Sequence, residues 1–332
     1  MSSSKLIVII GATGNQGGSV ANVFLEEPGW KVRALTRNTS STKSQALAAR
    51  GAEVVQADID TPATLLTAFE GANAIFAVSD YWGLFGDPAN KDKAQPGQPL
   101  NVWVAEHETQ QLKNIIDAAA KVPNLERFIF SSLSDATKWS KGVYTHVYHF
   151  DSKAKAAEYG RETYPDLWAK TTNEFNIFQN SDGVVQFIGH MEPDVKIPFV
   201  AAEEDSGPLV KALIQEPAGK NLIGYREWLT TRELASAFTK ATGLHAEVVT
   251  LPKGHFPPSI SKELKAQLED NMGYWNEFGY EGRDDPTVIH PRDLKSPPSL
   301  DTVEDYLKKQ DWTKTVKKFS IPNLFETMRV ET

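Results

Sequence analysis

A glycine-rich segment near the start of the chain has the composition and spacing of a phosphate-binding loop. It reads GATGNQG over residues 11–17 and follows the apolar run at residues 7–10. Glycines in such a loop permit a tight turn, close approach of the backbone to a pyrophosphate, and close packing of helix on strand. The following helix offers free N–H groups to phosphate. We predict a dinucleotide site whose contacts come from Gly11, Thr13, Gly14, Asn15, Gln16 and Gly17.

Arg37 stands at the end of the second apolar run and bears on which dinucleotide binds. NAD-binding proteins usually carry Asp or Glu about 20 residues beyond the glycine loop, where the carboxylate binds the ribose 2′-hydroxyl. This chain has Arg37 there, and a planar guanidinium fits a 2′-phosphate. Thr36, Thr39, Ser40 and Lys43 are further donors nearby. The sequence therefore predicts NADP(H) as the cofactor.

Two more strand ends are expected at the same crevice, because doubly wound sheets bind ligands beyond the carboxyl ends of their strands. Asp58 follows one apolar run, where its carboxylate either accepts from the adenine amino group or caps the next helix. Ala77 and Val78 end another run and are predicted to pass beneath the ribose. Tyr81 and Trp82 come just after them, where their rings either pack in the core or wall a substrate pocket.

These residues need a scaffold of alternating strands and helices, and the first 130 residues have that pattern. Apolar runs rich in Val, Ile and Phe predict buried parallel strands at residues 5–10, 31–36, 52–58, 73–79 and 127–132. Helix patterns lie between them at residues 15–27, 42–50, 62–70 and 105–121. Strands separated by helices indicate βαβ units, so we predict an α/β protein with a Rossmann-type doubly wound parallel sheet.

Composition excludes several other classes of protein. The 332 residues carry a net charge of −8 and include no cysteine. Direct nucleic-acid binding is not expected, because it needs clustered basic residues. Without cysteine there is no disulfide framework, and the seven histidines lack metal-ligand spacing, so we expect no metal. No apolar run approaches the roughly 20 residues that span a bilayer, and we expect a cytoplasmic protein without membrane contact.

These motifs together resemble the NmrA-like family of atypical short-chain dehydrogenases/reductases, which is related to isoflavone-reductase-like and redox-sensor proteins. The resemblance runs end to end through residues 11–19, 32–38, 54–58, 76–82, 149–153 and 167–172. It implies an NADP-binding Rossmann domain over residues 1–180. It also implies a smaller, partly interleaved α/β domain over residues 181–332 that faces substrate or partner. Part of residues 206–235 is expected to return to the Rossmann domain.

The resemblance also bears on proton transfer. Short-chain dehydrogenases usually carry Tyr-x-x-x-Lys on one helical face, where the tyrosine handles the proton and the lysine holds the nicotinamide ribose. Here residues 149–153 read HFDSK, so Lys153 is present and His149 replaces the tyrosine. Three roles stay open: His149 is the general acid, Lys153 delivers the proton, or both only bind ligands. Ser132 ends the fifth strand, where it polarises a substrate carbonyl or satisfies strand-end amides.

Two functions are compatible with these residues. The first is an NADPH-dependent reductase of a small aromatic or carbonyl-bearing metabolite, with Tyr81, Trp82, Phe150 and Phe178 lining the substrate pocket. The second is an NADP(H)-binding redox sensor that acts through a regulatory protein partner without turnover, and a nuclear location would fit such a regulator. The oligomeric state, monomer or homodimer, is open.

Overall fold

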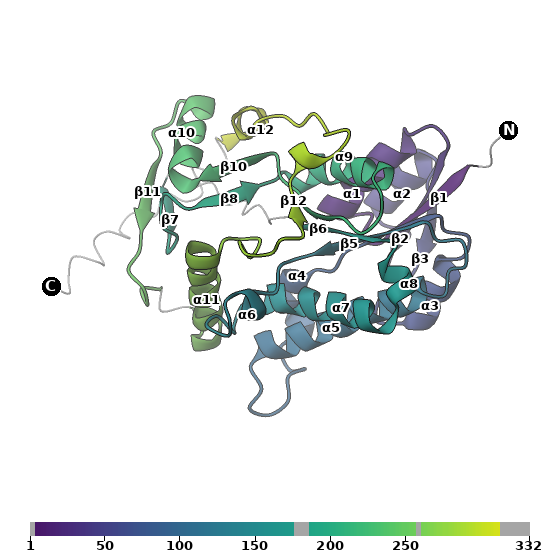
Figure 1. The fold of residues 1–332 in the computed structure, drawn as a ribbon, viewed down its shortest axis with the longest axis horizontal. Helices are drawn as coiled ribbons and strands as arrows, with labels where there is room; N and C mark the ends of the chain where they lie inside the picture. The colour runs from purple at the N-terminus through teal and green to yellow at the C-terminus, as the bar shows by residue number, and fades with distance from the viewer. Residues whose placement is uncertain (1–3, 176–185, 257–259, 313–332) are drawn as a thin grey trace.

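The computed structural model describes residues 4–175, 186–256 and 260–312, and its centre is an eight-stranded sheet in which every paired strand is parallel (Figure 1). From the first strand, β1 (Lys5–Ile9), the chain adds two strands on one side and then five on the other, starting with β4 (Ala74–Ala77). The strand order therefore reverses between β1 and β4. This is the predicted doubly wound sheet. In spatial order the strands are β12 (Val288–Ile289), β9 (Asn221–Ile223), β6 (Thr171–Phe175), β5 (Arg127–Ser132), β4 (Ala74–Ala77), β1 (Lys5–Ile9), β2 (Trp30–Thr36) and β3 (Glu53–Gln56).

Helices cover both faces of this sheet (Figure 1). Successive side chains of a strand point to opposite faces of the sheet, so Val8 packs into one core cluster, and Ile7 and Ile9 pack into the other. Both side-chain parities are therefore buried, as the apolar runs predict. One layer holds α3 (Pro62–Ala68), α5 (Leu100–Ala119), α7 (Tyr148–Thr163) and α8 (Pro165–Trp168). The other layer holds α1 (Asn15–Leu25), α2 (Thr42–Ala49) and α9 (Ala202–Gln215).

The C-terminal part of the chain forms a smaller α/β unit at one end of the sheet (Figure 1). It contains two two-stranded sheets, one antiparallel and one parallel. A separate aromatic cluster packs the long helix α11 (Lys262–Phe278) against the sheet. The elements are β7 (Gln186–Gly189), β8 (Lys196–Phe199), β10 (Glu227–Thr230), α10 (Thr231–Thr242), β11 (Glu247–Thr250), α11 (Lys262–Phe278) and α12 (Val303–Lys309).

The two parts interleave along the chain. After β8 the chain forms α9, which packs on α1, and then β9, which pairs with β6, before β10 pairs back with β8. The helices approach closely, because a Cβ added at Gly207 would lie 2.4 Å from the carbonyl oxygen of Ser19. The partly interleaved fold is thus confirmed. The boundary at residue 180 lies outside the described residues and stays a prediction.

Several local features differ from the sequence-based expectations. Two short helices, α4 (Tyr81–Gly86) and α6 (Ala136–Trp139), were not predicted, and each begins after an aspartate that accepts from a backbone N–H of the first turn. Such caps stabilise helices that are too short for a periodic pattern. Single-turn 3₁₀ helices occupy Pro88–Asn90 and Pro291–Asp293. No helix in the described part of the chain is long and apolar enough to cross a membrane.

Candidate active site

A cavity of about 1030 Å³ opens at the carboxyl ends of β1 to β4, where the strand order reverses. This is the place at which open parallel sheets bind ligands. Most of the predicted cofactor contacts line it, namely Gly11, Thr13, Gly14, Asn15, Gln16, Gly17, Arg37, Asp58 and Val78. Ala77 is fully buried in β4 behind this wall, and its predicted contact beneath the ribose stays a prediction.

The glycine loop has the shape that a pyrophosphate requires. Gly11 has a φ of +68°, in the left-handed region that favours glycine. A Cβ added at Gly17 would lie 2.3 Å from the carbonyl oxygen of Gly11, so no other residue fits there. Gly14 precedes α1 without a side-chain cap. The first-turn amides of α1 are therefore open to an anion, and the residues of the loop fit a dinucleotide.

Two basic residues flank the glycine loop at the adenosine end of the cavity. Arg37 lines the cavity just beyond β2. Lys43, in the first turn of α2, donates from Nζ to the carbonyl oxygen of Thr13 at 3.1 Å. Asp58 also lines the cavity, and its Oδ1 accepts from the backbone N–H of Asp60 at 3.0 Å. The guanidinium of Arg37 thus lines the cavity, and the ammonium of Lys43 contacts Thr13, which also lines it.

Lys153 lies in a buried network beside the cavity wall. Its Nζ is 2.6 Å from Oε1 of Glu108, and the lysine and glutamate side chains are 3% and 0% exposed. Ser79, which lines the cavity just beyond β4, donates from Oγ to the same Oε1 at 2.7 Å. Ser152 donates to the other carboxylate oxygen. A single carboxylate oxygen therefore connects the ammonium of Lys153 with the cavity wall.

The sequence-based reasoning missed Glu108, although the sequence contains a signal for it. Glu108 lies in α5, four residues before Leu112 and four after Val104, and both of those residues are buried. This spacing places the glutamate on the apolar face of the helix. A carboxylate is seldom fully buried unless it is paired, so its position on that face predicts a cationic partner.

His149 lies one turn before Lys153 in α7, and it is neutral at ordinary pH. Burial lowers the pKa of His149 to about 3, and the nearby Lys153 charge adds to this effect. Its Nδ1 is 3.2 Å from Nε2 of Gln267 in α11. The rings of Tyr81 and Trp82 pack against the imidazole. An imidazolium is scarce under these conditions, which opposes the hypothesis that His149 acts as a cationic general acid.

The other predicted site residues lie in different surroundings. Ser132 is buried, and its Oγ donates to the carbonyl oxygen of Leu133 at 3.4 Å. Phe150 is buried and packs against Tyr274 and Tyr280 in the aromatic cluster, and its place in a substrate pocket stays a prediction. Phe178 lies outside the described residues.

The C-terminal part of the chain supplies a wall that the sequence patterns did not predict. The first turn of α9 contributes Ala202 and Glu203, and Tyr306 of α12 donates to Oε1 of Glu203 at 2.7 Å. Residues 310–312, which follow α12, complete this wall. These residues are about 200 to 300 positions away from the glycine loop, and a local sequence pattern carries no information about such contacts.

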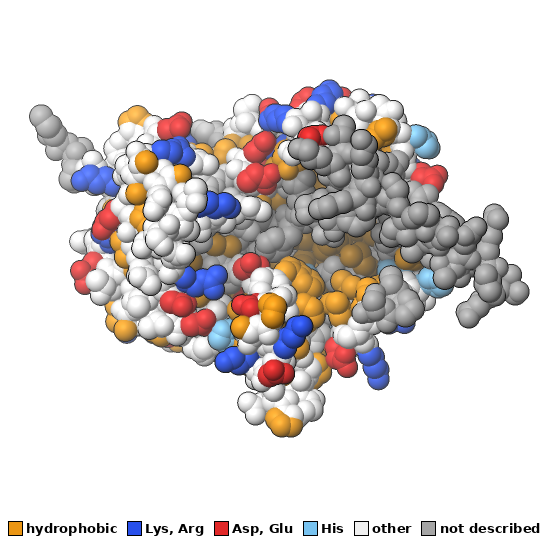
Figure 2. Space-filling model, turned by 180° about the vertical axis from the view of Figure 1, so that it is seen from behind, with side chains coloured by type: hydrophobic (Ala, Val, Ile, Leu, Met, Phe, Trp, Pro, Cys, Tyr) orange, Lys and Arg blue, Asp and Glu red, His pale blue; other side chains and the backbone are white. Residues whose placement is uncertain are grey.

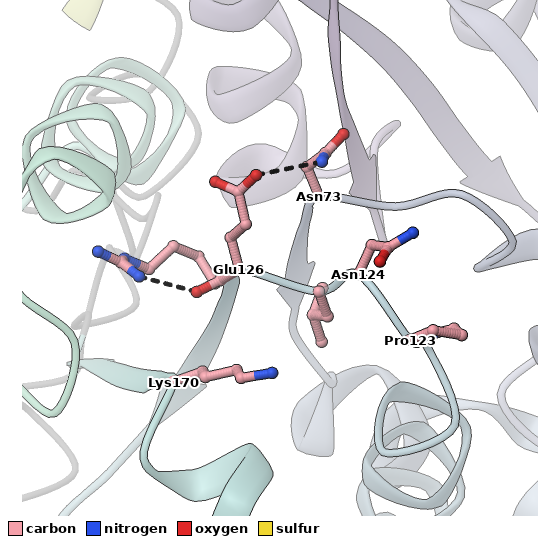
Figure 3. Close-up of a pocket in the computed structure, with 7 residues that line it drawn as sticks. Asn73, Pro123, Asn124, Glu126 and Lys170 are labelled. Atoms are coloured by element: carbon pink, nitrogen blue, oxygen red, sulfur yellow. Dashed lines mark hydrogen bonds between the residues drawn. The ribbon is translucent and has the colours of Figure 1, made fainter.

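A second hollow, of about 730 Å³, lies at the amino ends of β4, β5 and β6, opposite the carboxyl ends where the first cavity opens (Figure 3). Its polar groups already bind each other: Glu126 accepts from Asn73 at 3.3 Å and from Lys5 at 2.6 Å. Ligands of parallel sheets bind at the carboxyl edge, so this hollow is not the candidate site. Among the described residues no group of three or more His, Asp or Glu side chains is arranged to hold a metal.

Comparisons with known proteins identify the family to which this chain belongs. The NmrA-like family model matches residues 3–307, so the chain belongs to the NmrA-like family, as the sequence motifs indicated. One relative is the NmrA-like family domain-containing oxidoreductase hkm9 of Aspergillus hancockii, 31% identical over 266 residues, or 73% of this chain and 74% of that protein. Another is the corresponding oxidoreductase FrzB of Cladobotryum sp, 29% identical over 72% of this chain and 74% of that protein.

Solved structures share the fold at lower identity. NmrA, described as a negative transcriptional regulator, matches with a TM-score of 0.69 and 21% identity over 92% of this chain and 95% of NmrA. The triphenylmethane reductase of Citrobacter sp., solved with NADP(H), matches with a TM-score of 0.63 and 17% identity over 92% and 99% of the two chains. One neighbour is thus a regulator and the other a reductase.

Proposed function

We propose that this protein is an NADPH-dependent reductase of a small aromatic or carbonyl-bearing metabolite. The observation that carries the proposal is the shared oxygen of Glu108, which accepts both from Ser79 on the cavity wall and from Lys153. A buried, charged lysine beside a dinucleotide-shaped cavity is placed to contact the reacting end of a bound cofactor. The family relatives named as oxidoreductases support the same assignment.

The cofactor in this proposal is NADP(H). The open amides of the glycine loop would hold its pyrophosphate, and Arg37 and Lys43 would hold the 2′-phosphate. When bound, it supplies the hydride for the reduction. NmrA has been solved in complex with NADP and the triphenylmethane reductase in complex with NADP(H), which supports this choice.

Lys153 is the residue that we assign to proton handling. Its ammonium has three N–H donors. Glu108 accepts one at 2.6 Å, and the carbonyl oxygen of His149 accepts another at 3.4 Å. In the described chain the third donor has no partner. It is available to a ribose hydroxyl or to the substrate oxygen that gains a proton as hydride reaches the adjacent carbon.

Aromatic side chains beside the network support an aromatic substrate. Trp82, Phe85, Trp103 and Tyr148 are only partly buried and pack against the buried cluster of Tyr81, Val104 and Ala105. Hydrophobic side chains also gather at the centre of the face shown in Figure 2. Aromatic faces beside the reacting end of a bound cofactor would favour a planar, apolar ligand. The neighbours named as a triphenylmethane reductase and a quinone oxidoreductase fit this substrate class.

A non-catalytic redox sensor is the second candidate. It is favoured by the neutral His149 at the position where short-chain dehydrogenases carry tyrosine, and by the fold shared with NmrA, a negative transcriptional regulator. In this case Lys153 and His149 would only bind ligands. Occupation of the cavity by NADP(H) would then change the binding of a protein partner.

The deciding experiment is NADPH oxidation, followed by absorbance, against ketones, quinones and enones. Lys153→Met is compared with Lys155→Met, because Lys155 lies on the same helix but is exposed. We expect turnover in the wild type and in Lys155→Met, and a loss of about 10²-fold or more in Lys153→Met. No turnover in the wild type, with tight NADP binding and a change of oligomeric state or protease sensitivity on binding, would favour the sensor.

A further inference from the structure

A chain of buried hydrogen bonds leads from a backbone carbonyl to the imidazole of His149. Asn101 in α5 donates from Nδ2 to the carbonyl oxygen of Glu263 at 3.2 Å and to Oε1 of Gln267 at 3.1 Å. Gln267 in turn places Nε2 3.2 Å from Nδ1 of His149. Both amide side chains are buried, and Gln267 is 0% exposed. The chain links α5, α7 and α11, which come from distant parts of the sequence.

The first bond fixes the direction of the others. A carbonyl oxygen only accepts, so the atom of Asn101 that contacts Glu263 must be the amide nitrogen. That nitrogen donates to Gln267, so the atom of Gln267 that receives it must be the oxygen. The hydroxyl of Tyr81 lies 2.9 Å from the carbonyl oxygen of Asn101 and 3.1 Å from this oxygen of Gln267, so its single proton can go to either acceptor and the orientation of Gln267 rests on Asn101. The amide nitrogen of Gln267 therefore faces His149 and donates to it.

Acceptance at Nδ1 determines which ring nitrogen of His149 carries the proton. A neutral imidazole has one donor and one acceptor nitrogen, so a ring that accepts at Nδ1 carries its proton on Nε2. A proton on Nδ1 would face the N–H of Gln267. In the described chain Nε2 has no hydrogen-bond partner. The ring contacts are with Tyr81, Trp82 and Phe150, and the ammonium of Lys153 lies 3.4 Å from the backbone carbonyl oxygen of the same residue.

We propose that Gln267 is a positioning residue that holds His149 as the neutral tautomer with the proton on Nε2, which then donates a hydrogen bond to the substrate oxygen. This inference rests on the proposed reductase function. A neutral imidazole can polarise a carbonyl in this way without transferring a proton. His149 would then stabilise the charge that develops on oxygen, and Lys153 would supply the proton. Because Gln267 belongs to α11, the C-terminal part of the chain sets the state of a residue in the Rossmann layer.

The test is the ¹⁵N NMR spectrum of the histidine side chains in the cofactor-free protein, with His149 assigned by loss of its signals in His149→Gln. In the wild type at neutral pH we expect the proton on Nε2. Gln267→Glu replaces the donor with a carboxylate that accepts from Nδ1, so the proton moves to Nδ1 and His149 titrates at higher pH. Gln110→Glu is the matched control, since it adds the same charge at an exposed position of α5.

A second variant covers the outcome in which a buried glutamate unfolds the chain. Gln267→Met removes the donor without adding charge, and we expect the Nε2 preference to weaken to a mixture of tautomers. With the best substrate, kcat should fall by about 10²-fold in Gln267→Glu and in Gln267→Met, with little change in KM. A wild-type His149 that carries its proton on Nδ1, or is doubly protonated at neutral pH, would overturn the proposal whether or not the protein turns over substrate. A different outcome is that wild-type His149 carries its proton on Nε2 but the protein turns over no substrate. That outcome would overturn the reductase function and the donor role of His149, while the influence of Gln267 on the tautomer would stand.

Discussion

The ammonium of Lys153 lies 2.6 Å from the carboxylate of Glu108, and neither side chain is accessible to solvent beyond 3%. An exposed pair, Lys5 and Glu126, has the same separation of 2.6 Å with side chains 48% and 46% exposed. The two pairs differ mainly in burial. Burial of one charge without its partner is costly, whereas exposed charges are solvated by water. We therefore expect that losing one partner costs much more free energy of unfolding in the buried pair than in the exposed pair.

Removing one partner of the buried pair should destabilise the fold. Glu108→Leu leaves the ammonium of Lys153 buried and unpaired, so we expect a loss of about 3–5 kcal/mol in the free energy of unfolding, measured in urea. Glu126→Leu should cost about 1 kcal/mol or less. The double variant Glu108→Leu, Lys153→Met removes both charges and should recover much of the loss. Equal effects of Glu108→Leu and Glu126→Leu would contradict this account.

Two adjacent glycines allow a matched test of the loop. A Cβ at Gly17 would lie 2.3 Å from the carbonyl oxygen of Gly11, whereas a Cβ at Gly18 would have its nearest neighbour at 3.5 Å. We expect Gly17→Ala to cost about 1–3 kcal/mol of stability and to weaken NADP binding severely. Gly18→Ala lies within α1 and should be neutral, or stabilising by up to about 1 kcal/mol. Urea unfolding and cofactor titration by fluorescence measure both effects, and tight NADP binding by Gly17→Ala would count against a pyrophosphate at this loop.

The centre of the sheet was predictable because β1, β4 and β5 are buried on both faces over most of their length. Continuous apolar runs predicted β1 at residues 5–10 and β5 at residues 127–132, and the structure has Lys5–Ile9 and Arg127–Ser132. The spacing of Thr230 and Glu233 is that of a capping box and predicts a helix over residues 231–242, and the structure has that helix with both bonds of the box. In these segments local preference and tertiary burial agree.

Other elements and contacts depend on long-range packing. The strands β8, β10 and β11 have four residues each and pair only with one partner, which leaves little periodic pattern to detect. The spacing of Asp301 and Glu304 also predicts a capping box, but this prediction is wrong by one residue, because Thr302 is the N-cap and accepts from the N–H of Asp305. Gln267 reaches His149 across 118 positions of sequence, and no local rule predicts such a contact.

The preference for a phosphorylated cofactor should depend on Arg37. Replacing it with alanine removes charge-assisted hydrogen bonds to a 2′-phosphate and leaves the remaining contacts of the cavity in place. We expect Arg37→Ala to weaken NADP binding by about 10- to 100-fold, with little effect on NAD. Arg50→Ala is the control, because Arg50 is an exposed arginine that binds Glu26 outside the cavity. Isothermal titration with both cofactors gives the ratio, and an unchanged ratio would remove Arg37 from the 2′-phosphate site.

The low pKa of His149 makes the stability of the fold depend on pH. The folded protein keeps this ring neutral down to a pKa of about 3, whereas the unfolded chain protonates it near 6.5. Between these values the unfolded state binds the extra proton, so this contribution is complete above pH 6.5 and is lost as the pH falls toward 3. The expected slope is about 1.4 kcal/mol per pH unit within that window. His149→Gln should lack this part of the slope, while the carboxylates of the chain titrate equally in both proteins. Urea unfolding of both proteins at pH 7, 6 and 5 measures the difference, and parallel stability curves would mean that His149 is not held neutral by its surroundings.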